Sequence, residues 1–272
     1  MNKKRKTIGL ALGSGGIRGL AHVGVIKKLA EHHIPIDFIA GSSIGSWVGA
    51  HFALFQDLEL LEEITVGRQK EKFYAFIEPT IDGGLIKGTK MEKLIDTWLL
   101  GKNFEDTKIP FCAVATDLIS GNSIVLNTDK LAPALRASMS IPTLFAPFAY
   151  KNYLLVDGGI SQPVPDEVVK QMGADIVISV NLDNYIKNDN FAVEKQNSLR
   201  YVATRSINVI RYHLSKYSTT HSDIIIEPYT PTVGASSFRD YFAQKIAGAK
   251  LVENGEIETE KMIGKIKELM KG

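Results

Sequence analysis

A serine between two glycines is the first candidate for chemistry in this sequence. Gly41 and Gly45 flank Ser43 in the pattern G-x-S-x-G, after the apolar run 36–40 and before the apolar stretch 47–55. We expect a strand before this motif and a buried helix after it. At such a turn the serine hydroxyl is pushed out of the packed layers and can act as a nucleophile. Ser43 is therefore the candidate nucleophile.

A glycine-rich loop near the N-terminus is the second candidate. The sequence GSGGIRG over 13–19 follows a predicted strand, 7–12, and precedes apolar residues at helical spacing over 20–31. The backbone amides of such a loop can converge on one negative oxygen, helped by the positive end of the following helix. The loop, bounded by Gly13 and Gly19, is thus a candidate anion site.

Three kinds of anion-binding site are possible for this loop. A dinucleotide fingerprint is disfavoured because, counted from Gly13 and Gly15, the third glycine position falls on Arg18. A Walker A loop is excluded because no Gly-Lys-Ser/Thr ends the motif. The third possibility is an oxyanion hole for acyl transfer. Its predicted donors are backbone groups of the loop, at Gly15, Gly16 and Arg18.

An aspartate after a later strand supplies a candidate base. The predicted strand 153–156 delivers Asp157, followed by Gly158 and Gly159. A second Asp-Gly-Gly begins at Asp82, but no buried strand precedes it and a turn explains its glycines. We expect the strands that carry the loop, the serine and Asp157 to end at the same edge of a parallel sheet. Asp157 can then take the hydroxyl proton of the serine.

A Ser-Asp-His triad is the rival arrangement, with His213 or His221 as its base. It is disfavoured because Ser43 follows only one strand-helix unit, whereas an α/β-hydrolase needs several strands first. No histidine after Asp157 stands in a strand-end turn. The remaining histidines lie on predicted helices or at their ends, where packed or solvated imidazoles are expected: His22, His32, His33 and His51.

Composition limits the remaining classes. The chain has 272 residues, 44% hydrophobic and 23% charged, with a net charge of +2, so neither disorder nor nucleic-acid binding is indicated. The only cysteine, Cys112, excludes a disulfide within the chain and a zinc site built from cysteines. No apolar run approaches the roughly 20 residues of a transmembrane helix, and no signal peptide is recognisable. We expect a cytoplasmic protein, with at most peripheral contact at the inner face of the membrane.

The order of charged, apolar and polar stretches along the chain predicts its domain organisation. A basic N-terminal tail, 1–6, precedes a single domain over 7–272. The polar stretch 181–198 is predicted to be mobile. An amphipathic helix over 255–272 is expected to pack on the domain, with an interfacial membrane role as the alternative.

Two internal features have more than one interpretation. The aromatic segment 73–77 is either a small satellite core or the border of an apolar substrate channel or lid. Arg136 is expected to be structural, bound to backbone groups or a carboxylate.

Taken together, these motifs resemble the patatin-like phospholipase family, in its bacterial branch. The resemblance covers residues 7–180 closely and the rest loosely. It rests on the glycine loop 10–19, the elbow 41–45 and Asp157-Gly158-Gly159, with Ala115-Thr116-Asp117 and 136–142 in support. Where the family has Asp-Gly-Gly-Gly before x-Arg-Gly, this chain has Gly13-Ser14-Gly15-Gly16.

The resemblance implies a fold and an activity. The fold is a three-layer α/β/α sandwich with a mainly parallel central sheet. The activity is hydrolysis of acyl esters of lipids by a Ser43–Asp157 dyad, through an acyl-enzyme and without a metal or cofactor. A transacylase of the same fold and a non-catalytic lipid or anion binder are the alternatives. The headgroup, chain length, bond cleaved and oligomeric state are not given by the sequence.

Overall fold

The computed structural model describes residues 5–184, 198–230 and 245–271. Most of the predicted mobile stretch, 185–197, and the first four residues of the basic tail lie outside the described residues. In that tail Arg5 pairs with Asp37 at 2.6 Å, and the amine of Lys6 donates to the carbonyl of Leu269. The described end of the tail is therefore attached to the domain.

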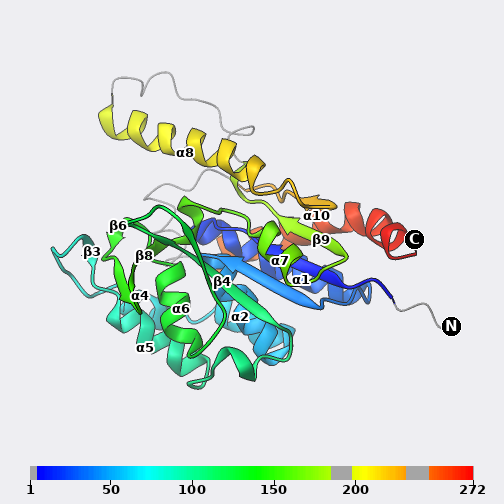
Figure 1. The fold of residues 1–272 in the computed structure, drawn as a ribbon, viewed down its shortest axis with the longest axis horizontal. Coiled ribbons are helices and arrows are strands. Elements are labelled where there is room, and N and C mark those ends of the chain that lie inside the picture. Colours follow the sequence, from blue (N-terminus) through cyan, green and yellow to red (C-terminus); the bar gives the residue numbers. More distant parts are fainter. Residues whose placement is uncertain (1–4, 185–197, 231–244, 272) are drawn as a thin grey trace.

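A mixed sheet forms the centre of the described part of the chain (Figure 1). Its order is β10-β9-β1-β2-β4-β8-β7, with β5 paired to β4, and β3 and β6 form a separate pair. Strands β10, β9, β1, β2 and β4 are parallel, whereas β5, β7 and β8 are antiparallel to their neighbours. The strands are β1 Ile8–Leu12, β2 Phe38–Ser42, β3 Gly84–Ile86, β4 Phe111–Asp117, β5 Ser123–Leu126, β6 Thr143–Phe145, β7 Phe148–Tyr150, β8 Tyr153–Asp157, β9 Ile176–Val180 and β10 Ile224–Ile226.

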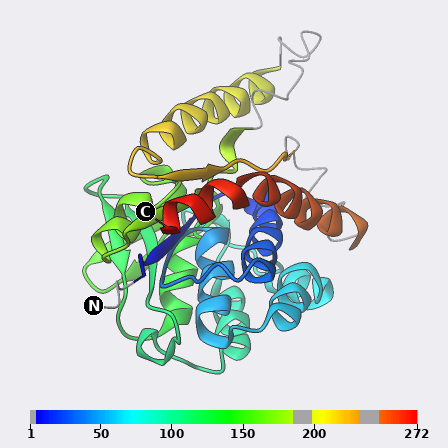
Figure 2. The same ribbon diagram turned by 90° about the vertical axis from the view of Figure 1, so that its right-hand side faces the viewer.

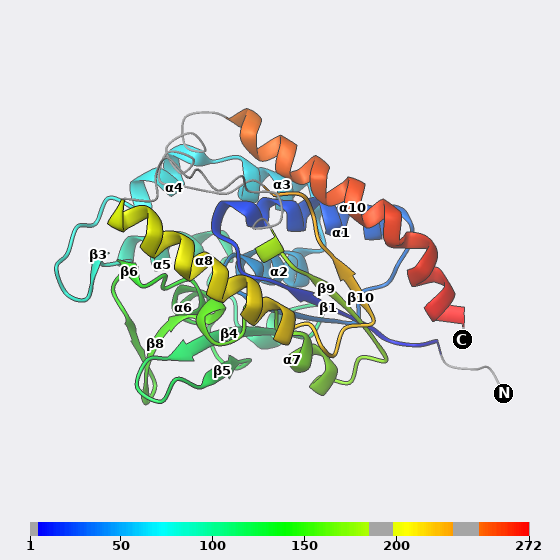
Figure 3. The ribbon, with the colours of Figure 1, turned by 90° about the horizontal axis from the view of Figure 1, so that it is seen from above.

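Helices cover both faces of this sheet, so the expected α/β/α fold is confirmed (Figure 3). The sheet is more mixed than the sequence suggested, because the strands beyond β4 run antiparallel. The helices are α1 Ala21–Glu31, α2 Ile44–Phe55, α3 Leu58–Val66, α4 Gln69–Ala75, α5 Thr89–Trp98, α6 Leu131–Ser138, α7 Asp166–Gln171, α8 Leu199–Tyr217 and α10 Lys245–Lys271, with the short 3-10 helices η1 Gly16–Leu20, η2 Phe104–Asp106 and η3 Gly158–Ile160.

Alternation along the central strands builds the two cores. Leu10, Leu12 and Ile39 are fully buried in the larger cluster, with α1, α2 and α6. Ala11 and Ala40, at the intervening positions, belong to a smaller cluster with α7. Because successive side chains of a strand point to opposite faces, a strand between two helical layers is apolar on both faces, as β1 is throughout and β2 is up to Gly41. Their continuous apolar sequences are the result.

The last helix packs against the first (Figure 2, Figure 3). A Cβ at Gly24 of α1 would lie 1.9 Å from the carbonyl oxygen of Val252, and one at Gly255 of α10 would lie 2.1 Å from that of Ala21. The two backbones therefore cross in direct contact. Leu251, Val252, Ile263 and Ile266 of α10 are buried in the main core, whereas Ile257 remains 48% exposed. Packing on the domain thus accounts for the apolar stripe of this helix.

The prediction that the strand before Asp157 runs parallel to its neighbours was wrong. β8 runs antiparallel to β4, so its end does not share the edge at which β1, β2 and β4 end. Register brings the carboxylate there instead: Ser42 is paired with Val114 of β4, and Asp157 is paired with the next residue, Ala115. Asp157 and Ser43 therefore lie on either side of β4.

Candidate active site

Ser43 occupies a strained turn between β2 and α2. Its backbone has φ 54° and ψ −124°, values that a residue with a Cβ rarely adopts and that recur at functional sites. The flanking glycines allow this turn to lie against β1. A Cβ at Gly41 would lie 2.4 Å from the carbonyl carbon of Gly45, and one at Gly45 would lie 2.1 Å from the carbonyl oxygen of Leu12. No larger residue fits at either position.

The hydroxyl of Ser43 donates a hydrogen bond to Asp157. The distance from Ser43 Oγ to Asp157 Oδ2 is 2.5 Å, and Asp157 Oδ1 accepts from the amide of Gly159 at 2.8 Å. Each of the two residues is 4% exposed. Burial raises the pKa of Asp157, and the hydrogen bond from Ser43 and the charge of Arg211 oppose this rise. The carboxylate is thus fixed at one oxygen and directed at the serine by the other.

No histidine takes part in this pair. His213 is exposed on α8, and the backbone and ring of His221 lie against Asp166. His22 is buried behind the glycine loop, where its Nε2 lies 2.7 Å from the carbonyl oxygen of Gly13. Burial lowers the pKa of His22 to about 4, so the ring is neutral at pH 7 and Nε2–H donates to that carbonyl. Its role is to support the loop.

The glycine loop leads from β1 into η1. The amides of Gly13 and Ser14 donate to carbonyls of neighbouring segments, and the amide of Arg18 donates to the carbonyl of Gly15 at 3.2 Å. Within the described residues, the amides of Gly15 and Gly16 make no such bond. They precede or begin η1, where the first amides of a helix have no internal partner. Of the three predicted donors, the amide of Arg18 is thus already bonded, whereas those of Gly15 and Gly16 have no backbone partner among the described residues.

The remaining motif glycines are required by close packing. A Cβ at Gly13, Gly19, Gly158 or Gly159 would lie 2.6, 2.3, 2.1 or 2.5 Å, respectively, from the nearest other atom. At Gly159 that atom is the hydroxyl oxygen of Ser14. The loop and the segment after Asp157 are therefore in direct contact.

An ion cluster beside the loop was not found from the sequence. Asp183, which is 1% exposed at its side chain, binds Arg18 at 3.1 Å and Arg211 at 2.9 Å. Arg211 also donates to the hydroxyl of Ser14 at 2.8 Å. The cluster attaches α8, which lies on the outside of the domain, to the glycine loop (Figure 1, Figure 2). Asp183 and Arg211 are far from the glycine loop in the sequence and belong to no motif, so no local pattern indicated that they would bind Arg18 and Ser14.

A second serine, Ser138, binds the backbone of the turn at Ser43. The amide of Ser43 donates to Ser138 Oγ at 2.9 Å, and Ser138 Oγ donates to the carbonyl of Val114 at 2.6 Å. Ser138 is fully buried at the end of α6. It therefore links the backbone of Ser43 to the strand that separates Ser43 from Asp157.

Arg136 is a structural residue, as expected. It is 2% exposed and donates to the carbonyls of Lys87, Gly88 and Ala146. It also donates to Ser140 Oγ, and the carbonyl of Ser140 accepts from the amide of Asp157. Burial lowers the pKa of Arg136 to about 10, which leaves it charged at pH 7. One buried cation thus joins the segment before α5 to the segment that positions Asp157.

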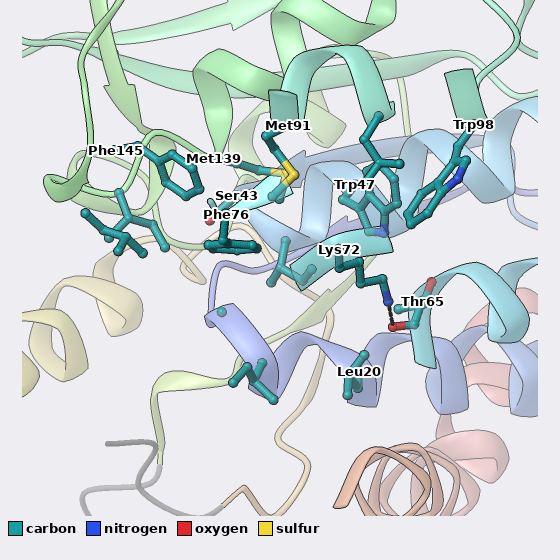
Figure 4. Close-up of a pocket in the computed structure, with 16 residues that line it drawn as sticks. Leu20, Ser43, Trp47, Thr65, Lys72, Phe76, Met91, Trp98, Met139 and Phe145 are labelled. Atoms are coloured by element: carbon teal, nitrogen blue, oxygen red, sulfur yellow. Dashed lines mark hydrogen bonds between the residues drawn. The ribbon is translucent and has the colours of Figure 1, made fainter. Parts of the chain in front are cut away.

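Ser43 opens into an apolar cavity (Figure 4). The cavity encloses about 780 Å³ of space not filled by protein, open solvent at its mouth included. Of the aromatic segment, Phe76 lines the cavity and packs against the main core, whereas Phe73 and Tyr74 of α4 are exposed, so the segment forms no separate core. The lining residues are Gly16, Ile17, Leu20, Ser43, Ile44, Trp47, Thr65, Lys72, Phe76, Met91, Leu94, Trp98, Met139, Ile141, Leu144 and Phe145.

Two general properties complete the description. Within the described residues, no group of three or more His, Cys, Asp or Glu side chains is arranged to hold a metal ion. The described helices include none with the length and apolar character needed to cross a bilayer.

Comparison with known proteins identifies the family. The family model of patatin-like phospholipases matches residues 10–169, which include the glycine loop, the elbow and Asp157. The chain belongs to the patatin-like phospholipase family. Among family members, an uncharacterized NTE family protein of Mycobacterium tuberculosis, Rv1063c, is 36% identical over 177 residues. Human patatin-like phospholipase domain-containing protein 6 is 30% identical over 197 residues.

The extent of these matches differs between relatives. The mycobacterial alignment covers 65% of this chain and 49% of the relative, and the human one covers 67% and 14%. The chain therefore spans about half the length of the mycobacterial relative. The crystal structure of VipD from Legionella pneumophila shares the fold, with a TM-score of 0.66 at 12% identity over 97% of this chain and 67% of VipD.

Proposed function

We propose that this protein is a serine hydrolase that cleaves carboxylic ester bonds of phospholipids, lysophospholipids or related acyl esters. The proposal rests mainly on the 2.5 Å hydrogen bond from Ser43, which lines an apolar cavity, to Asp157. Membership of the patatin-like phospholipase family supports a lipid ester as the substrate. The unbonded amides of the glycine loop support an acyl-transfer reaction.

The proposed mechanism needs only these groups. Asp157 takes the proton of Ser43 as Oγ forms a bond to the ester carbonyl carbon, and the amides of Gly15 and Gly16 stabilise the oxyanion. The tetrahedral intermediate breaks its bond to the alcohol oxygen, and Asp157 returns the proton to that leaving group. Water then attacks the acyl-enzyme and gives a proton to Asp157, which passes it to Ser43. The fatty acid leaves, and the dyad returns to its starting state.

Labelling with a fluorophosphonate ester tests the proposal. We expect the protein to be labelled at Ser43, because a phosphonate mimics the tetrahedral intermediate and captures an activated serine. It should also cleave short-chain p-nitrophenyl esters. If the folded protein is neither labelled nor active on these esters, a non-catalytic binder of lipids or anions is the correct function.

A transacylase remains the second candidate, because the acyl-enzyme can react with an alcohol as well as with water. Nothing in the cavity selects between the two acceptors. Incubation of a phospholipid with the protein and an excess of a lipid alcohol separates them. Free fatty acid as the main product supports the hydrolase, and acylated alcohol as the main product overturns it.

We further propose that the protein contacts lipid surfaces through apolar side chains beside the cavity. The apolar rim consists of Phe73, Tyr74, Ile77, Ile81 and Leu85, all exposed, with Ile81 98% exposed. It is continuous in sequence with Lys72 and Phe76, which line the cavity. Exposed apolar groups next to a lipid site commonly mark the surface that meets a membrane.

Aspartate substitutions in this rim should lower activity on membrane lipids without lowering activity on a soluble ester. Ile81→Asp combined with Leu85→Asp is expected to lower hydrolysis of phosphatidylglycerol vesicles by about tenfold or more, because two apolar contacts with the bilayer are lost. Cleavage of a soluble p-nitrophenyl ester should not change. Leu100→Asp, at a site as exposed as Leu85 but at the far end of α5, is the matched control. Equal losses in the rim and control variants would contradict this surface.

A further inference from the structure

The cavity that receives Ser43 has a second polar region. Nearly all of its lining is hydrocarbon or aromatic, and Lys72 is the one charged side chain that the described residues contribute to it. In Figure 4 the amine of Lys72 points away from Ser43 and toward Thr65. A chain attached to Ser43 can therefore run past apolar walls and end near an amine.

The surroundings of Lys72 make this amine unusual. It donates to the carbonyl oxygen of Thr65 at 2.6 Å, and burial lowers its pKa to about 7. His51 lies close enough for the charge of Lys72 to lower the pKa of the imidazole further. The ring of His51 packs on Trp47 at 4.7 Å, and both of its nitrogens are buried without a hydrogen-bond partner among the described residues. Lys72 and Thr65 thus form a polar region in an otherwise apolar lining, and His51, which does not line the cavity itself, packs on the lining residue Trp47.

A buried amine does not strengthen the binding of a plain hydrocarbon chain, which has no group that can accept a hydrogen bond from it. Burying an amine in an apolar wall costs free energy, because the charged form loses its hydration. A ligand that brings an anionic oxygen restores much of that loss through a charge-assisted hydrogen bond. Lysine also has the reach of a flexible four-carbon side chain, so it can follow ligand groups of slightly different position.

From this placement, and resting on the proposed ester hydrolase, we infer that Lys72 forms a subsite for an oxygen-bearing end of the acyl chain, a carboxylate above all. The preferred acyl group is then one whose far end is oxidised, as in a monoester of a dicarboxylic acid. The ester carbonyl lies at Ser43 and the second carboxylate lies at Lys72. Chain length is selected because the cavity fixes both ends.

Paired ester series test this subsite. The mono-p-nitrophenyl esters of dicarboxylic acids are compared with p-nitrophenyl esters of simple acids of the same carbon number, and the ratio of their kcat/KM values is measured. For the unmodified protein we expect this ratio to peak at one chain length. Lys72→Met should lower the ratio at that length by about tenfold or more, the effect of one charge-assisted hydrogen bond. Lys70→Met, at an exposed lysine of the same helix, should leave it unchanged.

A purely structural lysine gives a different result. Lys72 also joins α4 to the end of α3 through Thr65, and loss of that link would lower the activity on both esters equally. An unchanged ratio in Lys72→Met, or no chain length with a preference in the unmodified protein, overturns the inference. If Lys72→Met fails to unfold cooperatively, Lys72→Arg serves instead: a retained preference with a shifted optimum length supports the subsite, and an unshifted optimum opposes it.

Binding to an inactive variant separates this inference from the proposed activity. Decanedioate and decanoate are titrated calorimetrically into Ser43→Ala, with and without Lys72→Met. Stronger binding of decanedioate that depends on Lys72 supports the subsite, even if the protein hydrolyses no ester. Ester hydrolysis that requires Ser43, together with equal binding of both acids, leaves the activity intact and overturns the subsite.

Discussion

Replacing Ser43 with alanine is expected to lower kcat/KM for p-nitrophenyl esters by roughly four to six orders of magnitude, as loss of a serine nucleophile does elsewhere. The substitution removes the oxygen that donates to Asp157 and forms the acyl-enzyme. Labelling by a fluorophosphonate should disappear with it. Steady-state kinetics and intact-protein mass spectrometry measure the two effects.

Ser42→Ala is the matched control for this change. Ser42 is the adjacent residue in the same motif, is fully buried, and its hydroxyl has no hydrogen-bond partner among the described residues. Its removal should leave labelling and kcat/KM within a few-fold of the unmodified protein. A Ser43→Ala protein that keeps its activity, or a Ser42→Ala protein that loses it equally, would contradict the assignment of the nucleophile.

Replacing Asp157 with asparagine is expected to lower kcat/KM by roughly three to four orders of magnitude, because a neutral amide cannot take the serine proton. Asp82→Asn is the control, since Asp82 is also followed by two glycines but is exposed and binds Thr80 in a turn. A kcat/KM that survives in Asp157→Asn, measured at ester concentrations below KM, would show that another group acts as the base.

The pH dependence of kcat/KM for the unmodified protein also tests the assignment of Asp157 as the base. Asp157 must be ionised to act as a base, so activity falls as the pH falls through its pKa. Burial raises that pKa above the ordinary aspartate value, which moves the acid limb of the profile to higher pH. We expect the acid limb of the kcat/KM profile to report a pKa above the ordinary value of an aspartate. A pKa at or below that ordinary value would contradict the assignment of the buried Asp157 as the base.

Stability should respond to Asp157 in the opposite direction to activity. A carboxyl whose pKa is raised by folding contributes stability below its unfolded pKa, and this contribution is lost as the pH rises through the folded pKa. At neutral pH the buried carboxylate therefore costs the fold free energy. Asp157→Asn should unfold at no lower temperature than the unmodified protein at pH 7, so a lost activity cannot be attributed to unfolding.

The local motifs of this protein were predictable because each depends on residues close in sequence. The turn at Ser43 needs Gly41 and Gly45 within five residues, and the loop amides need glycines that follow a strand. A strand that must be apolar on both faces, such as β1, is recognisable from its composition alone. The family relationship follows from the same short segments, which the family model also covers.

The arrangement around those motifs was not predictable in the same way. The direction of β8 depends on its pairing with β4, and its apolar residues are compatible with either direction. Asp183, Arg211 and Ser138 have ordinary sequence surroundings and become part of the site only through contacts across the fold. In the sequence Lys72 is one of two lysines in the charged segment 68–72, and only its place in the lining of the cavity distinguishes it from Lys70.

The sequence by itself determined the kind of chemistry, because an elbow serine, an anion-binding loop and a strand-end aspartate are each encoded within a few residues. Only the tertiary structure decided that Ser43 and Asp157 meet across β4, that no histidine joins them, and which apolar residues and which amine line the cavity beside Ser43. The physical reason is that conformation at a tight turn depends on local sterics. Distances between strands, burial and shifted pKa values depend instead on residues that the chain brings together from far apart.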